Sequence, residues 1–172
     1  MSGRQFIIYD LEATCWRSPK PRQVEIIEIG AVKVNEELEI VDEFCMFIKP
    51  LLHPKIDKFC TKLTSITQDD VEDAPHFDEV IAEFEKWMDV DNTRTALFSW
   101  GDFDRRQFVK DAQLHELDLT WLKYWACLQS EFASVAIVFS RQVMFWVMNL
   151  IPKISRLGNE HNIIDRLCKQ DS

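Results

Sequence analysis

The sequence contains no paired-cysteine motif. Its five cysteines are scattered through 172 residues, without CxxC or zinc-like spacing: Cys15, Cys45, Cys60, Cys127 and Cys168. An odd number of cysteines with such spacing argues against a disulfide framework and against a structural zinc site. We therefore expect a reducing compartment, which is the cytoplasm, or the nucleus if the source is a eukaryote.

A secretion signal and an excess of positive charge are also missing. Residues 1–5 are polar and lead directly into a short apolar run, with no basic start, long apolar stretch and small-residue cleavage site. The formal charge of −9 argues against a protein that coats nucleic acid nonspecifically, because contacts with phosphates supply that affinity. A nuclease is still compatible with this charge, since it needs clustered carboxylates and only a few local basic groups.

Three local groups of cations are present within the acidic chain. They are Arg17, Lys20 and Arg22; Lys55, Lys58 and Lys62; and Arg105, Arg106 and Lys110. Each group forms either a solvated surface or a place that receives a phosphate backbone.

The chain has no linker, internal repeat or low-complexity tract, and its length predicts a single domain over residues 1–172. A long apolar stretch at residues 132–151 is interrupted by Ser140, Arg141, Gln142 and Asn149. Such groups at the centre of a membrane span would be costly in lipid. We therefore expect buried strand and helix segments there and no membrane partner.

The apolar periodicity predicts a mixed α/β domain. The expected strands span residues 6–9, 26–34, 38–48 and 95–100, and the expected helices span residues 54–63, 77–88 and 102–115. A further short helix is expected after Thr67, because Asp70, three residues later, completes a capping box.

Two acidic residues follow the apolar part of the first predicted strand. Asp10 and Glu12 flank Leu11, so their side chains leave the same face and can converge on one hard cation. For an arbitrary pair of acids at a strand end, a solvated turn is the more common explanation. The surrounding sequence must therefore decide between a turn and a metal site.

That surrounding sequence resembles a known family. The first motif and second strand of the DEDD superfamily of 3′-to-5′ exonucleases closely resemble IIYDLEATCW and VEIIEIGAVKV. The family's segment from the third strand into a helix and an L-T-x-I-T-Q turn is similar to FIKPLLHPKIDKFCTKLTSITQDDVEDAP. The resemblance covers residues 5–115 and favours the DEDDh branch of small exoribonucleases, which includes the histone-mRNA 3′-end exonucleases and their bacterial relatives. It implies an RNase H-like exonuclease fold, with a central mixed β-sheet flanked by helices.

The family's second motif, in which an acidic residue follows an aromatic one at the start of a helix, is similar to SWGDFDRRQF. This resemblance assigns Asp104, which follows Phe103, as a metal ligand. Asp102 is the competing carboxylate. It is well placed to cap the start of the helix, a role that aspartate favours.

The family's last motif is a histidine followed five residues later by an aspartate on a C-terminal helix, and its nearest match here is GNEHNIID. The match makes His161 the family histidine. Without a gap, Arg166 occupies the place of the aspartate. With a one-residue deletion the ligand is Asp165, although one helix position rotates a side chain by about 100°. We adopt Asp165; residues 121–172 otherwise diverge from the family.

The resemblance implies a two-metal mechanism. Two Mg²⁺ or Mn²⁺ ions would activate water and stabilise the leaving 3′ oxygen, held by four carboxylates: Asp10, Glu12, Asp104 and Asp165. His161 would take the proton from the attacking water. The product would be a nucleoside 5′-monophosphate.

The expected partner is the 3′ end of single-stranded RNA, or of DNA, and the resemblance assigns no protein partner. Aromatic faces grip a terminal base with little sequence preference. Phe59 and Phe103 match pocket positions of the family, and Trp100 is a further aromatic just before the second motif.

Two other functions stay open at this point. A phosphatase of the D-x-D type also has an acidic loop after an apolar strand, but Glu12 and the strings beyond residue 22 argue against it. A non-catalytic RNA-binding or regulatory module that keeps the fold without the last carboxylate is favoured by Arg166. Mn²⁺-dependent activity that disappears in Asp10→Ala would separate the exonuclease from both.

Overall fold

The computed structural model describes residues 5–17, 22–37, 39–89 and 95–128. The strands are β1 (Gln5–Ala13), β2 (Ile26–Val34), β3 (Ile40–Phe47), β4 (Thr95–Ser99) and β5 (Trp125–Cys127), and the helices are α1 (Lys58–Thr64), α2 (Gln68–Glu72), α3 (Phe77–Met88), α4 (Asp102–Leu114) and the 3-10 helix η1 (Thr120–Tyr124). This order confirms the predicted mixture of strands and helices.

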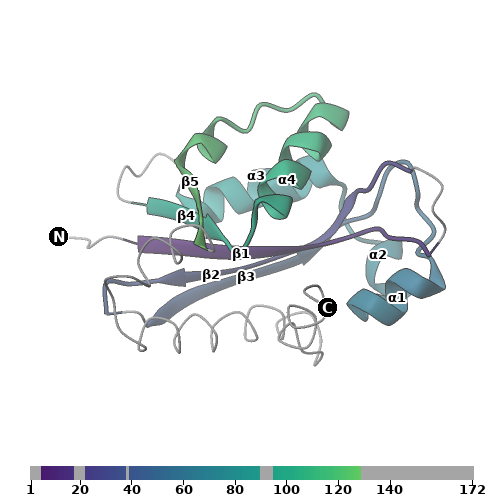
Figure 1. Cartoon of the computed structure of the whole chain (residues 1–172), viewed down its shortest axis with the longest axis horizontal. Helices are drawn as coiled ribbons and strands as arrows, with labels where there is room; N and C mark the ends of the chain where they lie inside the picture. The colour runs from purple at the N-terminus through teal and green to yellow at the C-terminus, as the bar shows by residue number, and fades with distance from the viewer. Residues whose placement is uncertain (1–4, 18–21, 38, 90–94, 129–172) are drawn as a thin grey trace.

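The five strands form one sheet in the order β3-β2-β1-β4-β5 (Figure 1). Strands β1, β2 and β3 pair antiparallel, whereas β4 lies parallel to β1 and β5 lies parallel to β4. The sheet is therefore mixed, as the family resemblance implied.

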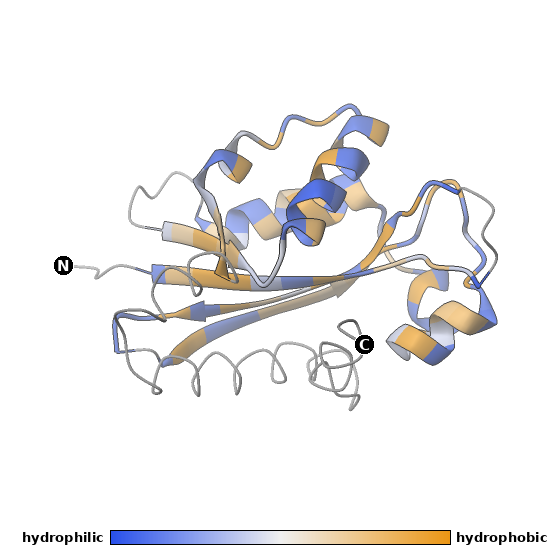
Figure 2. Ribbon diagram, in the orientation of Figure 1, coloured by the Kyte–Doolittle hydropathy of each residue, from blue (hydrophilic) through white to orange (hydrophobic). Residues whose placement is uncertain are grey.

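Helices α3 and α4 pack on one face of the sheet, and α1 and α2 lie beyond one end of it (Figure 1). Aromatic rings join the layers: Tyr9 of β1 lies 5.2 Å from Phe108 of α4, and Phe108 stacks on Phe84 of α3 at 6.1 Å between ring centroids. All three side chains are buried. The outer faces of these helices are largely hydrophilic, and the strands largely hydrophobic (Figure 2).

Strand β1 divides its side chains between the two faces of the sheet. Ile7, Tyr9 and Leu11 enter the large core under α3 and α4, whereas Ile8 joins a second cluster with Val32. Since side chains alternate along a strand, Asp10 and Glu12 lie on the face of Ile8, away from that large core.

Several predicted boundaries move in the structure. The strand expected over residues 6–9 is Gln5–Ala13, so Asp10 and Glu12 lie within it. The helix expected over residues 54–63 begins only at Lys58, because the side chain of Asp57 accepts a hydrogen bond from the backbone N–H of Phe59 at 2.8 Å and caps the helix there. The strand expected over residues 38–48 is Ile40–Phe47. The capping box of Thr67 and Asp70 before α2 is confirmed.

Residues 129–172 lie outside the described residues, and with them the apolar stretch 132–151, His161, Asp165 and Arg166. Within the described ranges, no helix is long and apolar enough to span a membrane. One domain over residues 1–172 stays a prediction.

Candidate active site

Strand β1 carries Asp10 and Glu12 past the end of its pairing with β4. Only Gln5 to Ile8 of β1 are paired with β4, and Ile8 lies opposite Phe98. On the other side, β1 stays paired with β2, where Glu12 lies opposite Glu28. The two acidic residues, both half-buried, are therefore held by a regular strand and border the loop that connects β4 to α4.

Helix α4 begins at that loop and brings Asp104 to Asp10. The Asp104 side chain is buried, with 6% of its surface exposed. Burial and, after it, the negative charge of Asp10 raise the pKa of Asp104 to about 8, while hydrogen bonds from its neighbours, including the backbone of Leu11, act in the opposite direction. Two carboxylates from distant parts of the chain are thus held close together.

Asp102, the competing carboxylate, faces the solvent. Its side chain is 48% exposed and forms ion pairs with Arg105 at 3.9 Å and with Arg106 at 2.9 Å. The prediction that Asp102 caps the helix is wrong: the N-cap is Gly101, and Asp102 is the first residue of α4. The geometry nevertheless favours Asp104 over Asp102 as a ligand.

Carboxylate oxygens are the ligands that hard divalent cations prefer, and a cation near Asp10 and Asp104 would offset the repulsion that raises the pKa of Asp104. The residues present therefore fit such an ion. In the described part of the chain, no three His, Cys, Asp or Glu side chains are already grouped as a set of ligands. The predicted fourth ligand, Asp165, and the predicted base, His161, lie outside that part.

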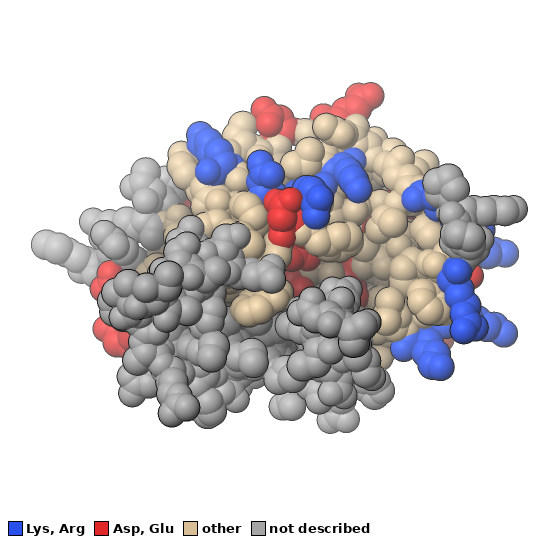
Figure 3. All heavy atoms as spheres, in the orientation of Figure 1, with Lys and Arg blue, Asp and Glu red and all other residues tan. Residues whose placement is uncertain are grey.

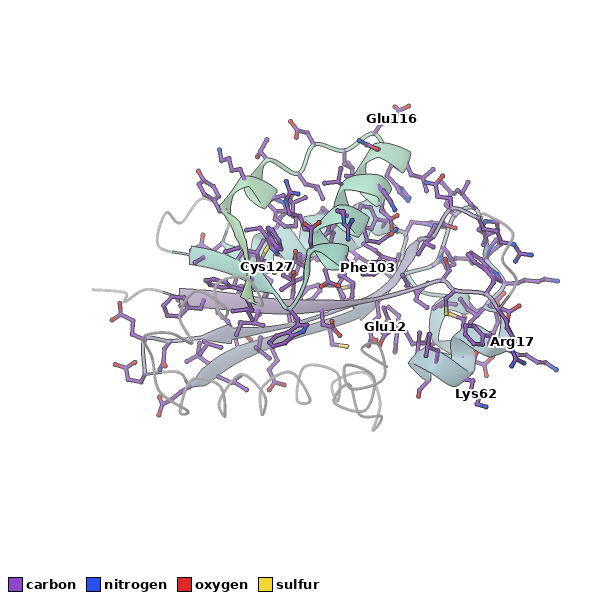
Figure 4. All side chains as sticks on the ribbon, viewed as in Figure 1. Glu12, Arg17, Lys62, Phe103, Glu116 and Cys127 are labelled. Atoms are coloured by element: carbon purple, nitrogen blue, oxygen red, sulfur yellow. The ribbon has the colours of Figure 1, made fainter. Side chains whose placement is uncertain are left out.

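The predicted aromatic contacts differ in exposure. Phe103 and Phe59 are 51% and 36% exposed, and Trp100 is half-buried. Phe103 and Glu12 lie in the same central part of the view in Figure 4, whereas Lys62, on α1, lies near its end. Exposed aromatic side chains such as these are available to a nucleobase.

Basic side chains border the acidic residues. Figure 3 shows acidic side chains in a recess at the centre of this face, with lysines and arginines along its upper side and at the end near α1. Arg105 stacks on Trp125 at 5.5 Å. Arg22 and Lys110, from two of the predicted cation groups, line the same pocket of about 560 Å³.

Sequence reasoning missed Glu28, the neighbour of Glu12 on β2. Directly opposed residues point to the same face of a sheet, so Glu28 adds a carboxylate next to Glu12. It is 8% exposed, and burial raises its pKa, while a hydrogen bond from the Cys45 thiol at 3.3 Å acts in the opposite direction. A glutamate within a largely apolar strand was the available signal.

The polar contacts that fix α4 were also missed. Asp111 accepts hydrogen bonds from the backbone N–H of Ile26 at 2.6 Å and from Gln107 at 3.0 Å, and Gln107 donates to the carbonyl of Val24 at 2.7 Å. Asp111 and Gln107 are buried. The contacts with Ile26 and Val24 join positions more than 80 residues apart in the chain, so no local pattern points to them.

Comparisons with known proteins agree with the resemblance. The family model described as Exonuclease matches residues 7–136. ERI1 exoribonuclease 3 of Mus musculus is 30% identical over 173 residues, covering 95% of this chain and 50% of the relative. The 3′-5′ exoribonuclease 1 of Homo sapiens is 30% identical over 163 residues, covering 90% of this chain and 45% of the relative.

Among solved structures, the nuclease domain of 3′hExo, a DEDDh family member bound to rAMP, matches with a TM-score of 0.72 and 28% identity, covering 80% of this chain and 72% of that chain. This match confirms the expected RNase H-like fold. The chain spans about half the length of the curated relatives it matches.

Proposed function

Because this chain belongs to the exonuclease family, we propose that it is a 3′-to-5′ exoribonuclease, which hydrolyses phosphodiester bonds from the 3′ end of single-stranded RNA and releases nucleoside 5′-monophosphates. The observation that carries this proposal is the meeting of Asp10 and buried Asp104 at the start of α4. RNA is favoured over DNA because the similar curated proteins are named exoribonucleases and the similar nuclease domain is bound to rAMP.

Family membership implies dependence on divalent metal, and we propose Mg²⁺ or Mn²⁺. When bound, two such ions supply an activated water nucleophile and stabilise the leaving oxygen. Asp10, Glu12 and Asp104 would hold them, with Asp165 as the fourth ligand. The rigid pairing of β1 with β2 fixes the first two carboxylates, and the contacts of α4 with the segment before β2 fix the third.

We assign His161 as the group that takes the proton from the attacking water. An imidazole suits this step because its unperturbed pKa lies close to physiological pH. Two of the other histidines have structural contacts instead. The ring of His76 hydrogen-bonds with the carbonyl of Lys49 at 3.1 Å, and His115 lies 4.0 Å from Asp78.

Phe59, Trp100 and Phe103 would contact the terminal nucleotide. A base stacks on an aromatic face whatever its identity, which suits an enzyme that removes successive nucleotides. The exposed rings of Phe59 and Phe103 support this role, and half-buried Trp100 would contribute an edge at the end of β4.

The test is to incubate the purified chain with 5′-labelled single-stranded RNA, or DNA of the same sequence, in Mn²⁺ or Mg²⁺. We expect RNA to shorten from its 3′ end and Asp10→Asn to abolish the shortening, whereas exposed Asp118→Asn serves as a matched control with parental activity. RNA that is bound but never shortened would favour the non-catalytic binding module instead.

A further inference from the structure

Two thiols meet beside the candidate site. Cys15 lies two residues after the end of β1, and Cys60 lies in α1. The thiol of Cys15 hydrogen-bonds with the sulfur of Cys60, and Cys60 Sγ also lies 3.6 Å from the carbonyl oxygen of Ala13. The two cysteines are 45 positions apart in the sequence (60 − 15), so this contact is made by the fold.

One thiol of the pair is buried and the other is partly exposed to solvent. Cys60 is 1% exposed and packs in an apolar cluster with Ile27, Ile66 and Val71, against which half-buried Cys15 packs from outside. The hydrogen bond from Cys15 lowers the pKa of Cys60 to about 7, although burial acts in the opposite direction. A lowered thiol pKa increases the fraction of thiolate, which is the form that peroxides oxidise.

We propose that Cys15 and Cys60 are a redox modification site, in which a peroxide converts the two thiols into a reversible disulfide that slows the nuclease. Cytosolic disulfides are usually of this transient, sensing kind. Cys45 and Cys127 have other contacts, since their thiols donate to Glu28 at 3.3 Å and to the carbonyl of Trp100 at 3.4 Å.

The chemistry has two steps. Cys15 passes its thiol proton to the sulfur of Cys60 and, as the more exposed of the two, attacks the peroxide; an S–O bond forms, the O–O bond breaks, and the leaving hydroxide takes up one proton from the solvent as water. Cys60 then attacks the sulfenic acid, forming the S–S bond and releasing a second water. In sum, two thiols and one hydrogen peroxide give one disulfide and two waters, and two electrons pass from sulfur to oxygen.

The effect of the disulfide on nuclease activity rests on the proposed function. It would arise because both cysteines lie close in sequence to residues of the candidate site. Cys15 follows Glu12 by three residues, and Cys60 follows Phe59 directly. A disulfide holds its sulfurs about 2.05 Å apart, closer than two hydrogen-bonded thiols, and it ties the start of α1 covalently to the segment after β1. Because displacements of about 1 Å in a catalytic site can reduce rates on the order of 100-fold, we expect the oxidised protein to be at least about tenfold slower.

The first arm of the test does not depend on activity. The full chain is treated with hydrogen peroxide, its remaining thiols are alkylated, and it is digested with trypsin without reduction. Cleavage after Arg4, Arg17, Lys58 and Lys62 places the two cysteines in the peptides 5–17 and 59–62. We expect these peptides joined, lighter by two hydrogen atoms than their sum, and separated by dithiothreitol. Both thiols alkylated, or either one linked elsewhere, would overturn the proposal.

The second arm measures RNA shortening before oxidation, after it, and after dithiothreitol. We expect a reversible loss in the parent and no loss in Cys15→Ser; a variant with Cys45, Cys127 and Cys168 replaced by serine is the matched control and keeps the response. A joined peptide with unchanged activity would overturn the regulatory role. A reduced parent that never shortens RNA would instead overturn the proposed function, while the peptide arm still decides the disulfide.

Discussion

At the scale of single residues, two aspartates in one turn of α4 have opposite surroundings. Asp102 is solvent-exposed and paired with two arginines, whereas Asp104 is 6% exposed and lies near Asp10. Each helix position rotates a side chain by about 100°, so two positions place these carboxylates on opposite sides of the helix. Only Asp104 can therefore approach β1.

The first prediction separates these two aspartates. Asp104→Asn removes a carboxyl group that would bind the metal and is expected to slow RNA shortening by at least about 100-fold, the upper end of what loss of an outer-shell partner costs a metal site. Asp102→Asn, the matched control on the exposed side, should stay within about threefold of the parent. Single-turnover shortening in Mn²⁺ measures both, and equal losses would contradict the assignment of Asp104.

A second prediction concerns the pH dependence of stability at Asp111. Burial raises the pKa of this carboxyl to about 7, although its hydrogen bonds to Ile26 and Gln107 act in the opposite direction. The folded state thus binds a proton that the unfolded chain has already released, so the stability from this group is fully present below about pH 4 and is lost as pH rises toward 7. From pH 5 to pH 8, the parent should lose about 1–3 kcal/mol relative to Asp111→Asn.

Urea unfolding at several pH values measures this difference. Asp118→Asn changes an exposed aspartate seven residues after Asp111. The unfolding free energy of this variant should follow that of the parent at every pH. A constant difference between the parent and Asp111→Asn from pH 5 to pH 8 would mean that Asp111 is ionised throughout in the folded state.

At the scale of elements, the buried carboxylate of Glu25 joins the segment before β2 to the loop before α1. It accepts hydrogen bonds from the backbone N–H groups of Leu51 at 2.5 Å, Leu52 at 2.9 Å and His53 at 2.9 Å. The backbone N–H of Glu25 donates to Thr14 Oγ1 at 2.9 Å. The loop that leads to α1 is therefore held against the end of β1.

The third prediction follows from this contact. Glu25→Ala leaves three backbone N–H groups without their acceptor and should lower the free energy of unfolding by about 2–4 kcal/mol. Exposed Glu37→Ala is the control and should change it by less than about 0.5 kcal/mol. Chemical denaturation at pH 7 compares the two. Equal stabilities would show that water replaces Glu25 at no cost.

At the scale of the whole molecule, charge is distributed unevenly. The chain carries a formal charge of −9, yet basic side chains border the recess that holds acidic ones (Figure 3). Lys110 lies six residues after Asp104 on α4, about 9 Å along the helix axis. Lys110 also lines a pocket with Arg22, and we predict that a strand whose 3′ end enters the site runs past these two cations.

The fourth prediction is that RNA affinity depends on few phosphate contacts. For single strands, the slope of log affinity against log salt is about −0.7 per phosphate contact. Lys110→Gln should therefore reduce the steepness of this slope by about 0.7. Lys86→Gln, an exposed change on α3, should leave it unchanged. Fluorescence anisotropy with the inactive Asp10→Asn protein gives the slopes, and a Lys110 variant with the parental slope would place the RNA elsewhere.

Much of the fold was predictable because its determinants are local. The strand predicted over residues 26–34 has the same bounds as β2 in the structure. The capping box of Thr67 and Asp70 correctly predicted the start of α2. The start of α1 was wrong because periodicity cannot show which residue caps a helix, and here Asp57 does so.

The candidate site was predictable only where one strand holds it. Side chains alternate between the two faces of a strand, so Asp10 and Glu12 lie on the same face of β1. The sequence alone suffices for this prediction. The approach of Asp104 required the family resemblance, because it depends on parallel pairing between distant strands. The contacts of Asp111, Glu25 and the two thiols have no local signal, since each partner is chosen by tertiary packing.

The parallel pairing of β1 with β4 has a consequence for synthesis. Gln5 pairs with Thr95, 90 positions later, whereas β1, β2 and β3 pair with strands adjacent in sequence. Local pairings form quickly, and distant ones must first overcome the entropy of closing a long loop. On the ribosome, the meander that bears Asp10 and Glu12 therefore emerges with the β1 edge still unpaired, and Asp104 joins these carboxylates only when β4 and α4 have left the exit tunnel.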